Sequence, residues 1–249
     1  MQIRPIKTKI FKEKEHLLPF IISYIPKIKN KTIIVITSKI VALSEARTIP
    51  DDGSPKTKVE AIKRESDWAI HTKYIWLTLK NGELMPSAGI DQSNGNKKIV
   101  LLPSRAWETA RYLHAALIRQ YRINCLGIII TDSRTHAFRK GCFGIPIAYA
   151  GICGLKNYKG EKDIFGRTIR TVIQNTADAL AAAAVLAMGE GSEQTPLAII
   201  TGAPVNFRSN INRKELYIDP EDDIYRPFFD SVRKISSRAT SRKRPGARP

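Results

Sequence analysis

Residues 128–133 read IIITDS, an apolar β-branched run that stops on a carboxylate and a hydroxyl. Such a run predicts a core strand, here over residues 126–131, whose end delivers polar side chains to a site. Asp132 and Ser133 are hard oxygen donors of the kind that hold Mg²⁺ or Mn²⁺, usually beside substrate phosphates. The alternative is a turn residue or a helix cap, which is the commoner use of an Asp after a strand.

Two further segments carry single carboxylates in loops of small residues. Residues 88–94 read AGIDQSN and contain Asp91, and Glu190 lies between two glycines just after a predicted helix. The negative end of that helix dipole favours a cation near Glu190. If the three segments converge, they form a metal-dependent, phosphate-handling site at loop junctions. Taken singly, Asp91 reads equally well as an Asx turn before Ser93, and a solvated loop carboxylate is the commoner reading of Glu190.

Around these segments, helical and strand patterns mix without a strict βαβ repeat. Residues 104–119 show an amphipathic stripe, and an Ala-rich helix follows Thr176, its predicted N-cap. Asn81-Gly82 predicts a hairpin turn. We expect helices over residues 16–25, 59–70, 104–119 and 177–188, and strands over residues 32–36, 74–79, 84–87, 99–102, 126–131, 143–150 and 197–201. This mixture predicts an α+β fold of mixed sheets with packed helices rather than a doubly wound sheet.

The composition is that of an ordinary globular chain. Its 249 residues, 43% hydrophobic and 26% charged, suffice for a substantial core. No apolar run approaches about 20 residues, so we expect no membrane span, and the first residues lack the apolar core of a secretory signal. Three cysteines without a CxxC spacing predict neither a zinc site nor a disulfide framework, and Cys142 and Cys153 are expected in the core. We therefore expect a cytoplasmic protein with reduced cysteines.

The formal net charge of +18 is concentrated partly at the C-terminus. Residues 233–249 carry seven basic and no acidic residues, which predicts a disordered basic tail after a catalytic domain over residues 1–232. The basic body suits anionic substrates or nucleic acid, but scattered lysines without interleaved aromatics are most typical of a solvated surface. A nucleic-acid-binding protein is kept as an alternative. The carboxylate motifs disfavour it, because they would repel phosphates unless loaded with metal.

Two basic turns offer groups that could bind a polyphosphate or a carboxylate. Residues 158–167 place Lys162 and Arg167 beside glycines, and Arg139 lies in a second basic turn close in sequence to Asp132. Cationic side chains and the backbone N–H groups of such turns are common anion ligands. The alternative is a pair of surface turns with salt bridges.

Five blocks, taken in order, resemble the coenzyme F420-0:L-glutamate ligase family. They are SKIVALSEAR at 38–47, AGIDQSN at 88–94, IITDSRTHAFRKG at 129–141, YKGEKDIFGR at 158–167 and ADALAAAAVLAMGEG at 177–191. The resemblance runs from Ile3 to Gly202, and the last four blocks are specific to the family. It implies an α+β fold, an intertwined homodimer, and GTP-dependent addition of glutamate, by γ-linkage, to a deazaflavin coenzyme. Relatives with SRT after the Asp, as at 133–135, resemble proteins proposed to glutamylate folate.

The resemblance also implies two divalent ions per site, Mg²⁺ or Mn²⁺, and a nucleotide, GTP or ATP. By motif, Asp91 and Asp132 match a metal-binding pair, Ser133 replaces a Thr ligand, and Glu190 matches a ligand of the second ion. The matching nucleotide contacts are Ser38, Lys39, Asn94 and a loop that includes Met188, Gly189, Gly191 and Ser192.

The implied reaction activates a carboxylate as an acyl phosphate. The γ-phosphoryl group of the nucleotide would pass to the carboxylate of an anionic coenzyme acceptor, which the α-amine of glutamate would then attack. Asp132 and the metals would align the transfer. Lys162, Arg167 or Arg139 would stabilise the transferring group or hold an anionic substrate.

Three positions depart from the family pattern. Leu43 stands where many members have a nucleotide-contacting Lys, Ala46 replaces a Gly, and Thr201 replaces an Arg. These departures leave open a relative that binds nucleotide and metal without ligase activity. The acceptor, coenzyme F420-0 or a folate, and the choice of GTP or ATP stay open as well.

Overall fold

The computed structural model describes residues 1–210 and 212–227. The chain divides into a compact unit, Met1–Arg213, and a second unit that begins at Lys214. In the described part of the second unit, Arg226 pairs with Glu221 at 2.8 Å. The predicted basic tail and the predicted domain boundary at residue 232 lie outside the described residues.

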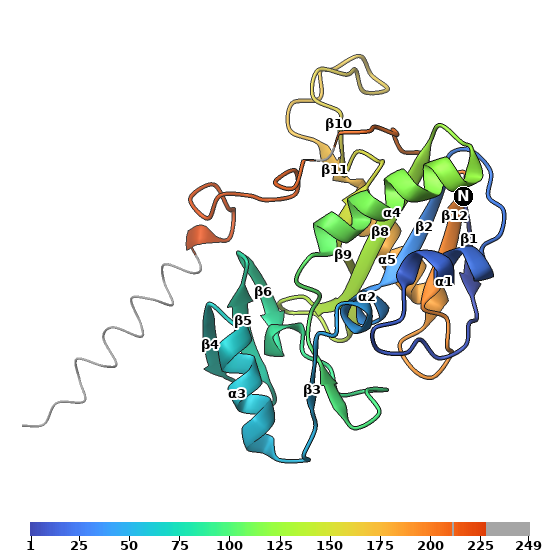
Figure 1. The fold of residues 1–249 in the computed structure, drawn as a ribbon. Helices are drawn as coiled ribbons and strands as arrows, with labels where there is room; N and C mark the ends of the chain where they lie inside the picture. Colours follow the sequence, from blue (N-terminus) through green and yellow to red (C-terminus); the bar gives the residue numbers. More distant parts are fainter. Residues whose placement is uncertain (211, 228–249) are drawn as a thin grey trace, which may run out of the picture. The chain divides into compact units, whose positions relative to one another are not determined.

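A five-stranded mixed sheet forms the centre of the large unit (Figure 1). Its order is β1-β12-β2-β8-β9, and the strands are β1 (Gln2–Ile6), β2 (Thr32–Thr37), β8 (Leu126–Thr135), β9 (Cys142–Ala150) and β12 (Leu197–Thr201). Strands β2 and β8 run parallel, and the other neighbours are antiparallel. Residues 32–36 and 126–131 are buried without interruption, which is typical of central strands covered on both faces.

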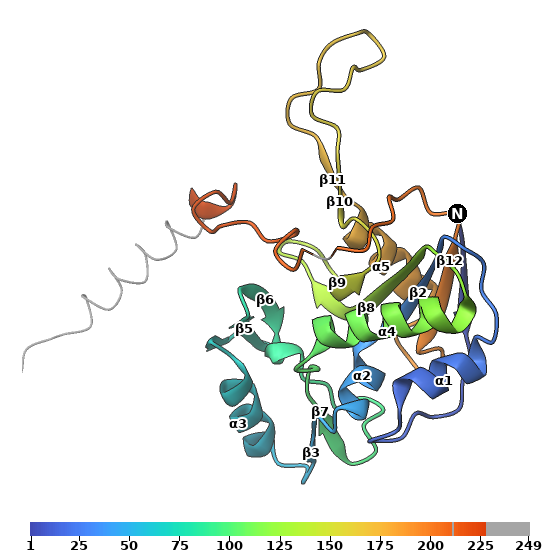
Figure 2. The ribbon, with the colours of Figure 1, turned by 45° about the horizontal axis from the view of Figure 1, so that its top comes forward.

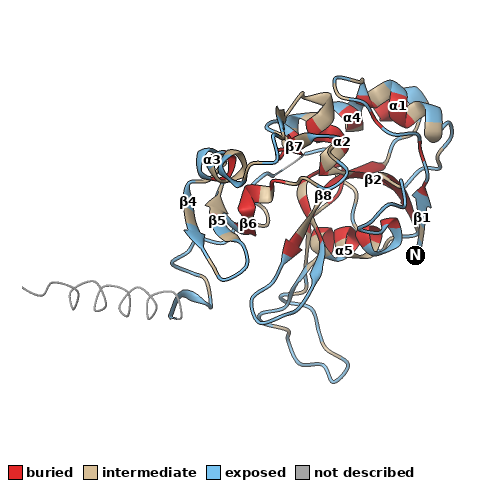
Figure 3. Ribbon diagram, turned by 90° about the horizontal axis from the view of Figure 1, so that it is seen from below, coloured by how far each residue is buried: buried red, intermediate tan, exposed pale blue. Residues whose placement is uncertain are grey.

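Helices cover both faces of this sheet (Figures 1 and 3). The helices are α1 (Leu17–Tyr24), α2 (Ser38–Ser44) and α4 (Ala106–Tyr121) on one face, and α5 (Thr176–Met188) on the other. The alanines of α5 allow this helix to approach the sheet closely. The close approach also requires a glycine at position 144 of β9. A Cβ at Gly144 would lie 2.3 Å from Val185, so β9 and α5 pack closer than side chains would permit.

A smaller lobe lies between α2 and α4 in the sequence. It contains β3 (Thr48–Pro50) paired with β7 (Lys98–Val100), helix α3 (Pro55–Glu65), and an antiparallel sheet of β4 (Trp68–His71), β5 (Trp76–Lys80) and β6 (Glu83–Pro86), followed by the 3₁₀ turn η1 (Ser87–Gly89). Helix α3 covers one face of the β4-β5-β6 sheet. Its Lys63 lies over the Trp76 ring, and its Glu65 pairs with Lys80 at 2.8 Å.

A third feature is a two-stranded ribbon that extends away from the central sheet (Figure 2). Strands β10 (Leu155–Asn157) and β11 (Ile173–Asn175) pair antiparallel and carry the loop 158–172. We call residues 155–175 the arm. Its Ile164 and Phe165 side chains are 92% and 83% exposed, which is unusual for large apolar residues.

The predicted α+β class is confirmed, but several local predictions were wrong. Strand β8 does not stop before Asp132. It continues to Thr135, because β9 keeps pairing with it past an irregularity at Ile130/Thr131. Residues 68–70 form β4 rather than the end of a helix, since α3 stops at Glu65.

Two side-chain predictions also change. The N-cap of α5 is Asn175 rather than Thr176, and its Oδ1 accepts a hydrogen bond from the Asp178 N–H at 3.0 Å. Cys142 is exposed and Cys153 is half-buried, although both were expected in the core, and all three cysteines are free. None of the helices in the described residues is both long and apolar enough to cross a lipid bilayer.

Candidate active site

The parallel pairing of β2 with β8 brings two polar chain segments to one edge of the sheet. Thr37 lies opposite Thr131, so Ser38 and Asp132 follow at adjacent strand ends. The Ser38 hydroxyl donates to Asp132 Oδ1 at 3.0 Å. Ligand sites in parallel sheets lie at the carboxyl ends of the strands. Asp132, the first of the predicted metal ligands, lies at this edge.

The loop that carries Asp91 reaches the same edge through Lys39. Lys39 Nζ pairs with Asp91 Oδ2 at 2.7 Å and donates to the Ser93 carbonyl at 2.8 Å. Ser93 also closes an Asx turn, because its N–H donates to Asp91 Oδ1 at 2.7 Å and its hydroxyl to Oδ2 at 2.9 Å. Asp91 therefore forms the Asx turn that one of its two readings predicted, and its carboxylate also pairs with Lys39.

The third segment follows the C-terminus of α5 and closes the other side. The Ser133 hydroxyl lies 2.9 Å from each carboxylate oxygen of Glu190. Asn94 Nδ2 donates to the Gly191 carbonyl at 3.2 Å, which ties this segment to the Asp91 loop. The three segments that the sequence singled out thus meet in space.

These segments line one cavity of about 850 Å³. All four predicted metal ligands and all seven predicted nucleotide contacts are among its lining residues: Asp91, Asp132, Ser133, Glu190, Ser38, Lys39, Asn94, Met188, Gly189, Gly191 and Ser192. Leu43 and residues 8–11 line it as well. A cavity of this size accommodates a nucleotide-sized ligand.

Behind Asp132 lies a buried cation that the sequence did not identify. Arg134 is only 4% exposed, its Nη1 pairs with Asp132 Oδ2, and its Nη2 lies 3.7 Å from Glu83 Oε2. Glu83 begins β6, so Arg134 links the Asp132 carboxylate to the smaller lobe. Breaking a buried pair of this kind leaves an uncompensated charge, so Arg134 fixes the position of Asp132.

The two aspartates differ electrostatically. Burial raises the pKa of Asp132, although Arg134 and the Ser38 hydrogen bond oppose that effect. Burial acts in the same direction on Asp91, but Lys39 and Ser93 prevail and lower the pKa of Asp91. A desolvated carboxylate such as Asp132 gains most from a further cation.

The chemistry of these donors fits Mg²⁺ or Mn²⁺. Carboxylates and a hydroxyl are hard oxygen ligands, and Asp91 and Asp132 already attract cations in the form of Lys39 and Arg134. The described residues contain no preassembled group of three or more His, Cys, Asp or Glu side chains that could hold a metal by itself. An ion here would therefore need further oxygen atoms, as Mg²⁺ sites that share substrate phosphates do.

Three predicted catalytic cations are not brought into the cavity. Lys162 and Arg167 lie on the exposed arm, where Lys162 Nζ donates to Thr168 Oγ1 at 2.8 Å, and Arg139 lies in the exposed turn between β8 and β9. None of the three is among the lining residues. Their roles stay predictions.

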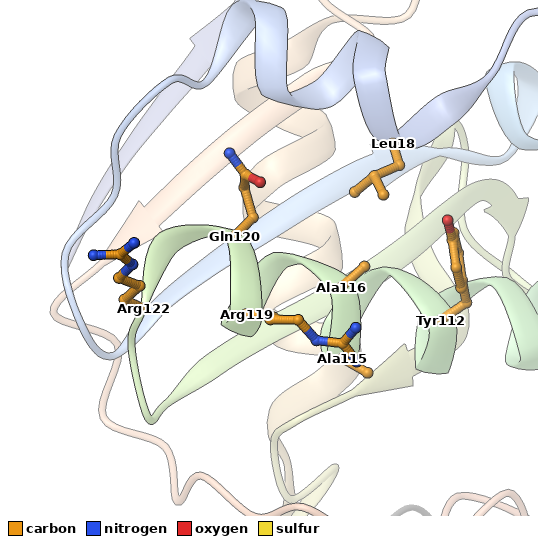
Figure 4. A pocket seen from close by; sticks show the side chains of 7 residues that line it. All are labelled: Leu18, Tyr112, Ala115, Ala116, Arg119, Gln120 and Arg122. Carbon is orange, nitrogen blue, oxygen red and sulfur yellow. The ribbon is translucent and has the colours of Figure 1, made fainter.

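A second hollow, of about 540 Å³, lies on the surface of α4 next to α1 (Figure 4). Tyr112, Gln120, Arg119 and Arg122 contribute its polar groups. Its lining holds no carboxylate, the side chain on which magnesium-type sites in proteins chiefly depend.

Sequence reasoning missed one neighbour of the site besides Arg134, and it named Ser93 only through the Asx turn of Asp91. Cys142 lies beside Glu190, and both burial and this carboxylate raise the pKa of the Cys142 thiol. Ser93 orients Asp91, as described above. The sequence shows an uninterrupted polar run at 132–134. Only the extension of β8 to Thr135 places Asp132 and Arg134 on the same face of the strand.

Comparison with known proteins gives a consistent result. The family model described as F420-0:Gamma-glutamyl ligase matches residues 5–202. The coenzyme F420:L-glutamate ligase of Methanococcus maripaludis (strain C7) is 35% identical over 230 residues, which cover 86% of this chain and 92% of the relative. The enzyme of the same name from Methanocaldococcus jannaschii is 32% identical over 244 residues, which cover 91% and 97%.

Proposed function

The chain belongs to the F420-0:gamma-glutamyl ligase family, and we propose that it is a nucleotide- and metal-dependent γ-glutamyl ligase. It would form an amide bond between L-glutamate and the carboxylate of a coenzyme acceptor, either coenzyme F420-0 or a folate. The observation that carries this proposal is the convergence of Asp91, Asp132 and Glu190 on one cavity with the Ser38-Lys39 pair. Carboxylates for metal and a lysine for phosphate are the groups that phosphoryl transfer needs.

The chemistry proceeds in two balanced steps. A carboxylate oxygen of the acceptor first attacks the γ-phosphorus of the nucleotide, which forms an acyl phosphate and releases the nucleoside diphosphate. The α-amine of glutamate then attacks the acyl carbon, inorganic phosphate leaves, and the amine loses a proton. Divalent ions held by Asp91, Asp132, Ser133 and Glu190 would neutralise the phosphate charge in the first step.

The chain's own residues supply positioning. Lys39 Nζ contacts both the Asp91 carboxylate and the Ser93 carbonyl. When a metal ion replaces Lys39 on Asp91, the freed ammonium group would pair with a nucleotide phosphate. Ser38 and Arg134 hold Asp132 from two sides. The loop after α5 lines the cavity beside them and would contact the nucleotide, as GTP or ATP.

We further propose that the enzyme is a homodimer with the fold of its family. The support is the arm, whose exposed Ile164 and Phe165 would be covered by a second copy. A basic nucleic-acid-binding protein is less favoured, because acidic side chains line the main cavity.

The test is a mass-spectrometric assay of the purified protein. The reaction contains GTP or ATP, Mg²⁺ or Mn²⁺, glutamate, and either coenzyme F420-0 or a folate. We expect a product heavier by one glutamyl unit, which Asp132→Ala abolishes and Glu60→Ala, an exposed change on α3, leaves intact. No product with any of these combinations would contradict the proposal. Nucleotide binding without product would instead identify a binding relative, as Leu43 in the cavity could allow.

A further inference from the structure

The β4-β5-β6 sheet has one covered and one bare face. The register places Thr78 beside Met85 on the face toward α3, where both are buried. On the opposite face every side chain is apolar. The cross-strand rows there are Trp68, Leu79 and Leu84, then Ile70, Leu77 and Pro86, with Ile75 continuing the row of β5. We call these seven residues the shelf.

Five of the seven shelf side chains are exposed, and Leu79 and Pro86 are half-buried. Trp68 and Ile70 are each 49% exposed, Leu84 is 48% exposed and Leu77 is 37% exposed. Figure 3 shows β4 mostly in the colour of exposed residues. Cross-strand apolar neighbours on a bare sheet face form a contiguous patch, and such patches mark binding surfaces.

The shelf is continuous with the candidate active site. Ile75 and Pro86, at one end of it, line the same cavity as Asp91 and Asp132. From Ile75 to Leu79, at the end of the turn and along β5, the apolar face extends away from the cavity by about 13 Å at 3.3 Å per residue. A ligand with its carboxylate at the metal-binding carboxylates could therefore lay a second, apolar part along the shelf.

We propose that the shelf binds the flat heteroaromatic ring system of the acceptor, whose carboxylate lies in the cavity. This inference rests on the proposed ligase function. Both candidate acceptors carry a planar ring system at one end of the molecule and the reacting carboxylate on a tail at the other. Trp68 offers a ring face for stacking, and the leucine and isoleucine side chains offer apolar contact. The shelf would then determine acceptor specificity without touching the reacting atoms.

The test measures equilibrium binding, so that it does not require turnover. Coenzyme F420-0 and folic acid are the probes, titrated into the wild-type protein and the double variant Ile70→Ser/Leu84→Ser by calorimetry. Both positions are half exposed, so the fold should tolerate serine there. We expect the affinity for the bound probe to fall about tenfold or more, because each substitution removes roughly half of a buried apolar side chain's contribution.

The matched control is Leu186→Ser on α5, which removes a leucine that is 86% exposed on a different face. It should leave probe affinity unchanged. Nucleotide affinity and molecular mass should be unchanged in both variants. Trp68→Leu, which keeps apolar area but removes the ring, should weaken binding less than the double serine variant.

Three results would overturn the inference. The first is an affinity within twofold of wild type for the double variant, and the second is no binding of either probe to the wild type. The third is a loss of affinity accompanied by a change in molecular mass, which would assign the shelf to contact with a second copy. Failure of the proposed ligase function alone would give a different result. The probes would bind, the double variant would bind them more weakly, and the wild type would make no glutamylated product.

Discussion

At the scale of single residues, Ala46 occupies a backbone conformation that favours glycine. Ala46 adopts φ +54°, in the left-handed region that disfavours residues with a Cβ. Its N–H donates to the Leu43 carbonyl at 3.1 Å, so the turn after α2 holds this conformation. Ala46→Gly should therefore raise the free energy of unfolding by about 0.5–1 kcal/mol, measured by urea denaturation.

The control is Ala187→Gly, at an exposed position within α5. Glycine there lowers helix stability, so the free energy of unfolding should fall by about 1 kcal/mol. If both changes destabilise the protein, the relief of backbone strain at Ala46 is too small to offset the added freedom of the unfolded chain.

Arg134 is the residue on which the geometry of Asp132 depends. Arg134→Met leaves Asp132 buried without its counter-charge and removes the contact to Glu83. The free energy of unfolding should fall by about 3 kcal/mol, and Arg134→Lys should recover part of that loss. Urea denaturation at neutral pH measures both. Equal stability of the methionine variant and the wild type would show that this ion pair does not hold the site together.

The sequence identified the site residues whose side chains are recognisable as oxygen donors. Asp91, Asp132, Ser133 and Glu190 were visible as oxygen donors at loop junctions, and all four line the cavity. Arg134 was not identified, because its partner Glu83 is distant in the chain and an arginine in a polar run is typical of a surface. Its burial depends on a contact between β6 and β8 that no local pattern encodes.

At the scale of elements, an ion cluster fixes α3 to the strands around it. Glu65, the last residue of α3, pairs with Arg47 at 2.5 Å and with Lys80 at 2.8 Å. Burial alone would raise the pKa of Glu65, but Lys80 and Arg47 prevail and lower it. Because the folded-state pKa is lowered, this stabilisation is present at neutral pH and is lost as the pH falls through the lowered pKa.

Comparing Glu65→Gln with the wild type tests this cluster. The variant should be less stable at pH 7 by about 1–3 kcal/mol, since two cations lose their partner, and the difference should shrink by pH 3. Glu60→Gln, exposed on the same helix, should have little effect at either pH. Urea denaturation at the two pH values measures both variants. If the stability difference between Glu65→Gln and the wild type instead grows at pH 3, Lys80 and Arg47 do not lower the pKa of Glu65.

The sequence predicted whether a segment forms a helix or a strand where the segment buries one face only or is buried completely. The buried runs of β2 and β12, the stripe of α4 and the Asn81-Gly82 turn were predicted from local pattern. The ends of elements were not, because tertiary pairing sets them. Strand β8 gains its last four residues by pairing with β9, and those residues carry Asp132 and Ser133.

At the scale of the whole molecule, the arm is the feature that a lone protomer does not explain. Its loop 158–172 makes its hydrogen bonds largely within itself, as between Tyr158 and Val172 and between Gly160 and Ile169. Large apolar side chains on such a projection are left to water unless another surface covers them. The sequence block that forms the arm was identified through family resemblance, whereas its projection from the body is a property of the fold.

The proposed homodimer makes the arm a subunit contact, and Ile164→Ser/Phe165→Ser tests it. If the arm binds a second copy, removing these two side chains, 92% and 83% exposed, should halve the molecular mass measured by light scattering. Because both side chains are almost fully exposed, their replacement should leave the fold of the protomer intact, as circular dichroism would show. Lys159→Ser on the same loop is the control and should keep the wild-type mass. Ligase activity separates two roles for the arm: if Lys162 or Arg167 serves the partner's cavity, activity should fall with the mass, because neither residue lines the cavity of its own protomer.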